Sequence, residues 1–212
     1  MASLKRRLAK YRVWFRELFR FCPISKLKVD RENLFLICGH RGSPVNKPEN
    51  TIPSFERALR EGVNSLETDL CVTKDKEVIL WHDWNPDELV ALLRENGMEP
   101  EVAYKPYFPA LFSDVRNKTS ELKLTEIRKH FNYAKKGEST SVNAHIPTLK
   151  EFINWIKDKS QIKYVFLDIK VPRDEKELVL VILDQLDELV KEINPSAKFI
   201  IESVEARSRC LT

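Results

Sequence analysis

Short segments of strand-like character recur along the chain and are separated by segments with helical periodicity. Residues 34–38 form a continuous apolar run that ends at a glycine, and residues 65–70 alternate between apolar and acidic side chains. Strands that alternate with helices indicate a parallel α/β architecture. We expect strands at 34–38, 65–70, 77–81, 163–170 and 198–203, and helices at 50–59, 87–96, 120–131, 149–157 and 175–193.

Residues 84–145 interrupt this alternation, because they contain two expected helices and several prolines but no clear strand. An insertion of this length in a compact domain is usually a functional lid or a small subdomain. We therefore expect an insertion after the third strand, at about residues 84–145, within a domain that spans residues 32–212.

Residues 1–31 form a basic arm, with ten Lys or Arg side chains and two acidic ones, whereas the whole chain has a net charge of only +4. The remainder is therefore mildly acidic, and a basic chain that binds nucleic acid is not expected. The arm carries apolar side chains at helical spacing, which predicts an amphipathic helix over residues 3–21 that can lie on a membrane surface. A helix packed on the domain or on a partner is the alternative. The apolar positions are Leu4, Leu8, Tyr11, Phe15 and Leu18.

Several classes of protein are excluded by simple patterns. No apolar run approaches the ~18–20 residues that cross a bilayer. The four cysteines form no CxxC pair, which argues against a zinc ribbon or a disulfide scaffold. Charged residues interrupt every stretch of the N-terminal arm that could serve as the apolar core of a signal peptide. We expect a cytoplasmic protein that can be peripheral to a membrane.

Polar side chains that can do chemistry sit at the C-terminal ends of four expected strands. In parallel α/β folds, side chains at these ends line the active site. The alternation of Glu67 and Asp69 turns both carboxylates to one side, where Asp168 from another strand can join them around a hard divalent cation. Each group alone has a simpler explanation: a structural histidine, a solvated acidic face, or an Asp168–Lys170 ion pair. The four groups are His40–Arg41, Glu67–Asp69, His82–Asp83 and Asp168–Lys170.

Four segments together resemble the glycerophosphodiester phosphodiesterase (GDPD) family: GHRGSPVNKPENT at 39–51, SLETDLCVTKDKEVILWHD at 65–83, IPTLKEF at 146–152 and LDIK at 167–170. The resemblance implies a TIM-type (β/α)8 barrel hydrolase. It implies cleavage of glycerophosphodiesters to glycerol 3-phosphate and an alcohol, with a calcium or magnesium ion (Ca²⁺ or Mg²⁺). By position, it implies His40 and His82 as the acid–base pair, Glu67, Asp69 and Asp168 as metal ligands, and Arg41, Glu49, Asn50 and Lys170 as substrate-binding residues.

Two features depart from the family pattern. The family usually has Glu where this chain has Asp168, and the Asp-x-Lys spacing is also similar to the related sphingomyelinase D group. A TIM barrel typically needs about 250 residues and eight strands. Five or six strands are expected here, so we expect a barrel that is incomplete at its C-terminal end, as a fragment rather than a natural short form.

Three other functions stay open at this point. A lysophospholipase D or sphingomyelinase D-like enzyme would act on lysophospholipid or other membrane lipids. An inactive remnant would bind a membrane surface or a partner, and a regulatory domain would bind phosphate without hydrolysis. The sequence does not fix the head group, the metal, the oligomeric state or which histidine is the acid.

Overall fold

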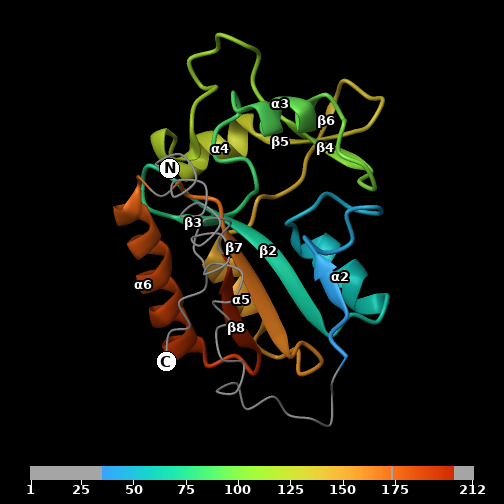
Figure 1. The fold of residues 1–212 in the computed structure, drawn as a ribbon, viewed down its shortest axis with the longest axis vertical. Coiled ribbons are helices and arrows are strands. Elements are labelled where there is room, and N and C mark those ends of the chain that lie inside the picture. Colours follow the sequence, from blue (N-terminus) through green and yellow to red (C-terminus); the bar gives the residue numbers. More distant parts are fainter. Residues whose placement is uncertain (1–34, 173, 203–212) are drawn as a thin grey trace, which may run out of the picture. The chain divides into compact units, whose positions relative to one another are not determined.

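The computed structural model describes residues 35–172 and 174–202 (Figure 1). The expected arm, residues 1–31, lies outside this range. One sheet contains β1 (Cys38–His40), β2 (Ser65–Val72), β3 (Val78–Leu80), β7 (Tyr164–Ile169) and β8 (Lys198–Glu202). The helices near it are α2 (Ile52–Arg60), α5 (Leu149–Ile156) and α6 (Lys176–Ile193).

Four of these strands are parallel, in the order β1-β2-β7-β8, which confirms the predicted α/β class. Strand β3 is the exception, because it pairs antiparallel with β2. Residues 73–77 alone connect the two strands, and a parallel crossover needs a dozen residues or more. The connection is a tight turn in which the Thr73 N–H donates to the Glu77 carbonyl at 3.0 Å.

The first strand is shorter and more exposed than the sequence predicts. The expected strand at 34–38 is a buried one, but β1 begins at Cys38, and Phe35 and Ile37 are exposed. Within the described residues β1 lies at an edge of the sheet and pairs only with β2, beginning at Cys38 opposite Ser65. The apolar run before Cys38 therefore has no described layer to cover it.

The main core lies on one side of β7, where Val165, Leu167 and Ile169 are buried while the alternate residues are more exposed. Helices α5 and α6 contact each other, and both contact the sheet. Helix α5 begins with a capping box: Thr148 Oγ1 accepts from the Glu151 N–H, and the Glu151 carboxylate accepts from the Thr148 N–H. The opposite side of β7 carries Asp168 together with the half-buried rings of Tyr164 and Phe166.

Residues 84–145 contain α3 (Leu89–Glu95), β4 (Tyr104–Tyr107), the 3-10 helix η2 (Thr119–Glu121), α4 (Leu124–His130), β5 (Asn132–Lys135) and β6 (Ser141–Val142). The expectation of no strands here is wrong, since β4, β5 and β6 form a second, antiparallel sheet. These strands have two to four residues, too few to show an alternating pattern, and one contains Pro106. Trp81, which follows β3, packs against residues 84–145. The centroid of its ring lies 5.1 Å from that of Tyr133 and 6.0 Å from that of Phe131.

Among the helices of the described residues, none combines the length and the apolar character needed to cross a membrane.

Candidate active site

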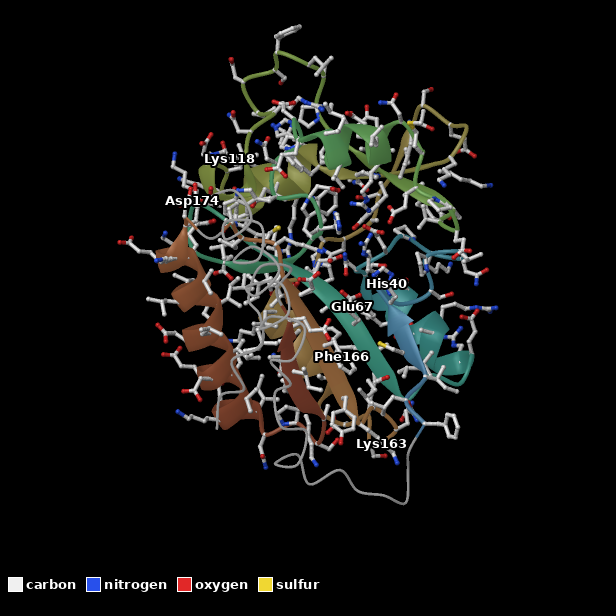
Figure 2. The ribbon with its side chains drawn as sticks, viewed as in Figure 1. His40, Glu67, Lys118, Lys163, Phe166 and Asp174 are labelled. Atoms are coloured by element: carbon white, nitrogen blue, oxygen red, sulfur yellow. The ribbon has the colours of Figure 1, made fainter. Side chains whose placement is uncertain are left out.

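The register of the parallel strands aligns the predicted acidic residues. His40 pairs with Glu67, and Asp69 pairs with Asp168. Neighbouring residues in register turn their side chains to the same face of a sheet. One carboxylate oxygen from each of Glu67, Asp69 and Asp168 lies within 4.8 Å of the other two. Figure 2 shows His40, at the end of β1, close to Glu67 on the neighbouring strand β2.

His40 ends β1, and a tight turn begins at the next residue, Arg41. Both residues lie next to Glu67. Arg41 and Gly42 have positive φ angles of 53° and 90°. The Arg41 N–H donates to Glu67 Oε2 at 3.0 Å. A Cβ on Gly42 would lie 2.5 Å from Ser54 Oγ and 2.7 Å from the Ser54 carbonyl carbon, so this position needs glycine on two grounds.

Asn50 positions Asp69 rather than facing open space. Its backbone is in the left-handed region, at a φ of 54°, which Asn tolerates better than most residues. The Asn50 amide donates to Asp69 Oδ2 at 2.7 Å, and its oxygen accepts from Thr68 Oγ1 and from the Asp69 N–H. The side chain is buried, and these contacts fix the orientation of Asp69.

Arg41 is buried among three carboxylates. Its Nε lies 2.9 Å from Asp69 Oδ2, and its Nη1 lies 3.1 Å from Glu49 Oε2 and 3.0 Å from Glu99 Oε1. The structure thus places Glu49, another predicted site residue, beside Arg41 rather than beside the carboxylates of Glu67, Asp69 and Asp168.

Lys170 contacts two members of this carboxylate cluster. Its Nζ lies 2.6 Å from Asp168 Oδ2 and 3.0 Å from Asp69 Oδ1. Burial alone would lower the pKa of Lys170, but the two carboxylates outweigh burial and raise it. The Asp168–Lys170 ion pair, given above as the simpler explanation of these two residues, is therefore present, and Lys170 also pairs with Asp69.

The two buried carboxylates of β2 have opposite pKa shifts. Burial raises the pKa of Glu67 to about 8, and repulsion from Asp69 acts in the same direction. Burial also acts to raise the pKa of Asp69, but the positive charges of Arg41 and Lys170, together with the hydrogen bond from Asn50, overcome it and lower the pKa to about 2. In the absence of a cation, burial therefore favours the protonated form of Glu67, whereas its neighbours favour the ionised form of Asp69.

The two histidines differ in exposure. The His40 side chain is 65% exposed, and its Nε2 lies 3.7 Å from Glu67 Oε2. Burial of part of the ring, aided by Arg41, lowers the pKa of His40. His82 follows β3, which the Trp81 N–H joins to the Asp69 carbonyl at 3.1 Å. Within the described residues, no hydrogen bond or ion pair joins His82 to the carboxylate cluster; its Nδ1 lies 2.8 Å from Asp83 Oδ1.

Sequence reasoning missed Arg94 and Glu99, which come from the insertion and reach the site. Arg94 forms ion pairs with Glu49, Asp83 and Glu99, and Glu99 also binds Arg41. Neither residue lies in a segment with a recognisable motif. A buried arginine at the centre of three carboxylates becomes visible only in three dimensions.

The donor set fits a hard divalent cation. Three carboxylates converge, and oxygen ligands are those that calcium and magnesium prefer. Within residues 35–172 and 174–202, the buried Asp168 Oδ1 accepts no hydrogen bond, so it keeps a lone pair for a ligand. These features support a cation site without selecting between the two metals.

Comparisons with known proteins place the chain in a family. The model of the glycerophosphoryl diester phosphodiesterase family matches residues 40–212. The chain belongs to this family. A glycerophosphodiester phosphodiesterase of Caldanaerobacter subterraneus is 31% identical over 170 residues, which are 79% of this chain and 57% of the relative. A lysophospholipase D of Rattus norvegicus is 29% identical over 153 residues, which are 72% of this chain and 40% of the relative.

Solved structures of other glycerophosphodiester phosphodiesterases share the fold. The Silicibacter pomeroyi protein superposes with a TM-score of 0.60 at 19% identity, over 80% of this chain and 57% of its own. An Oleispira antarctica phosphodiesterase, solved with the product sn-glycerol-3-phosphate, gives 0.56 at 21% identity, over 82% and 59%. The predicted TIM-type fold is confirmed by these relatives, and the described residues form an open part of such a barrel.

Proposed function

We propose that this GDPD-family chain is a metal-dependent phosphodiesterase that hydrolyses glycerophosphodiesters to glycerol 3-phosphate and an alcohol. The observation that carries the proposal is the convergence of Glu67, Asp69 and Asp168, with His40 beside Glu67. A hard cation and an imidazole next to one another are the parts that phosphodiester cleavage needs. Family membership and the 31% identity to a named glycerophosphodiester phosphodiesterase support it.

The cation would be held by Glu67, Asp69 and Asp168. When bound, it supplies Lewis acidity and neutralises charge on the phosphodiester oxygens. The described ion pairs of Arg41 use Nε and Nη1, so we assign its Nη2 to a phosphate oxygen. Lys170 offers its ammonium to the same group.

The histidines move the protons. One accepts a proton from the attacking hydroxyl, either water or the neighbouring glycerol hydroxyl, as the new P–O bond forms; attack by the glycerol hydroxyl gives a cyclic phosphate, which a second attack, by water, opens to glycerol 3-phosphate. The other donates a proton to the leaving alcohol oxygen as its P–O bond breaks. Asn50 and Glu49 act indirectly in this proposal, since Asn50 orients Asp69 and Glu49 holds Arg41.

The test is hydrolysis of glycerophosphocholine and glycerophosphoethanolamine with added calcium or magnesium, measured as release of glycerol 3-phosphate. Asp168→Asn should remove most of the activity. Asp174→Asn, which changes an exposed acidic residue outside the site, should leave it intact. An inactive wild type that is folded and fails to bind either cation in calorimetry would contradict the proposal and favour the remnant.

A second candidate is hydrolysis of lysophospholipids to lysophosphatidic acid, and the 29% identity to a lysophospholipase D supports it. The predicted membrane-binding helix at residues 3–21 would favour such a substrate and stays a prediction from the sequence. Release of choline from lysophosphatidylcholine micelles, compared with release from glycerophosphocholine, separates the two candidates. Co-sedimentation of the full chain with phospholipid vesicles tests the helix.

A further inference from the structure

We propose that Arg94 is the residue of the insertion that positions His82 for proton transfer. Its effect passes through Asp83. Arg94 Nη1 binds Asp83 Oδ2, and Asp83 Oδ1 lies 2.8 Å from His82 Nδ1. The kinetic part of this inference rests on the proposed function, whereas its structural part does not.

The three side chains are enclosed, so their contacts are not shared with bulk water. Arg94 and Asp83 are each 5% exposed, and the His82 side chain is 14% exposed. A buried carboxylate needs a donor for each oxygen. Within the described part of the chain, Arg94 supplies the donor for Oδ2, and the His82 ring is the partner of Oδ1.

This arrangement selects one tautomer of His82. Nδ1 lies 2.7 Å from Arg94 Nη1 as well as 2.8 Å from Asp83 Oδ1, and one nitrogen cannot accept from the first and donate to the second. If Nδ1 accepted from Arg94, the buried Asp83 Oδ1 would lose its described donor. The proton of the neutral ring is therefore on Nδ1, and Nε2 is the nitrogen that exchanges a proton with substrate.

Arg94 can hold this geometry because it is fixed at three points. Its Nη2 binds Glu49, its Nε lies 2.6 Å from Glu99 Oε2, and its Nη1 binds Asp83. Glu49 and Glu99 each also bind Arg41, so two carboxylates bridge the two guanidinium groups. A lysine offers a single point charge and cannot reproduce these directions.

Helix α3 is oriented as this role requires. It buries Ala91 and Arg94 while Leu89, Val90 and Leu93 are exposed. A surface helix normally turns its apolar side inward. In α3 the inward face carries Arg94, and its ion pairs take the place of buried leucines. These ion pairs connect the insertion to the residues of the site.

The test is the tautomer of His82, read from imidazole ¹⁵N shifts of the full-length protein without metal, at pH of about 9, where histidine is neutral. We expect a single Nδ1–H form in the wild type and a mixture in Arg94→Lys. The matched control is Arg116→Lys. Arg116 is also a buried arginine of the insertion, but its ion pairs are with Asp87 and Glu95, outside the site. The control should keep the wild-type spectrum.

Turnover supplies the second readout. Arg94→Lys should lower kcat about 10- to 100-fold and change KM by less than about 3-fold, as for loss of a residue that orients a catalytic group. Circular dichroism checks the fold. If Arg94→Lys does not fold, Glu99→Gln, which weakens one of the three contacts by removing its negative charge, should shift the tautomer ratio in the same direction by less.

The outcomes are distinct. An unchanged His82 spectrum in a folded Arg94 or Glu99 variant would overturn the inference, and so would an equal change in Arg116→Lys, which would reveal general loosening of the insertion. An inactive wild type would contradict the proposed function instead, while the spectra would still decide the role of Arg94.

Discussion

Cation affinity should rise steeply with pH, because a ligand of the candidate site is protonated in the metal-free protein. Burial raises the pKa of Glu67 to about 8. A carboxylate must lose its proton to bind a metal, so below that pKa the affinity falls about tenfold for each pH unit. Between pH 8 and pH 6 the loss is about 50-fold, because Glu67 is about half ionised at pH 8. Asp69, with a pKa of about 2, stays ionised throughout and adds nothing to this slope.

Titration calorimetry with calcium and with magnesium measures this slope. Repeating each titration in buffers of different ionisation enthalpy gives the number of protons released, which should approach about one per ion near pH 6 and vanish about one pH unit above the pKa of Glu67. Glu67→Gln should bind more weakly and lose the pH dependence. Asp174→Asn, an exposed position outside the site, should behave as the wild type.

A wild-type affinity that does not change between pH 6 and pH 8 would refute this reasoning. A slope that persists in Glu67→Gln would show that a different group takes up the proton.

The two histidines, Gly42 and the pKa of Glu67 each give a further prediction. His40→Ala and His82→Ala should each lower turnover by roughly 10²- to 10⁴-fold with unchanged circular dichroism, and near-normal turnover would remove that histidine from the mechanism. Gly42→Ala should lower the free energy of unfolding in urea by more than Gly62→Ala, since both have positive φ but only Gly42 meets Ser54; equal losses would contradict the clash. Because the raised pKa of Glu67 means that folding favours its protonated form, the metal-free protein should lose up to ~4 kcal/mol of stability as pH rises from about 5 to about 8, and unfolding midpoints that stay level would contradict this.

The parts of the fold that could be predicted are the strands whose own residue pattern agrees with the pairing in the structure. The strand at 65–70 was predictable from its alternating pattern and the strand at 163–170 from its apolar run, and the structure places Asp69 opposite Asp168. The direction of β3 was not predicted, since the turn at 73–77 contains no glycine and resembles any polar connection. The strands of the insertion were too short to carry a period.

In the candidate site too, local sequence patterns predict some residues and do not reveal others. The motifs locate the carboxylates because strand geometry alone turns Glu67 and Asp69 to one face. They do not reveal that the Asn50 amide donates a hydrogen bond to Asp69, because this contact depends on the left-handed backbone conformation of Asn50. They also do not reveal Arg94, because it lies in a helix where three aliphatic residues point outward and give no sign of the buried side.

The antiparallel return of β3 has a consequence for how this protein can change over evolution. Five residues separate β2 from β3, and this spacing sets how far along the sheet the imidazole of His82 lies from Asp69. Adding or deleting one residue there would displace the ring by about 3.3 Å and turn it to the other side of the strand. We therefore expect changes of length in the insertion beyond Glu99, and not in the residues that join β2 to His82 or in the segment that carries Arg94 and Glu99.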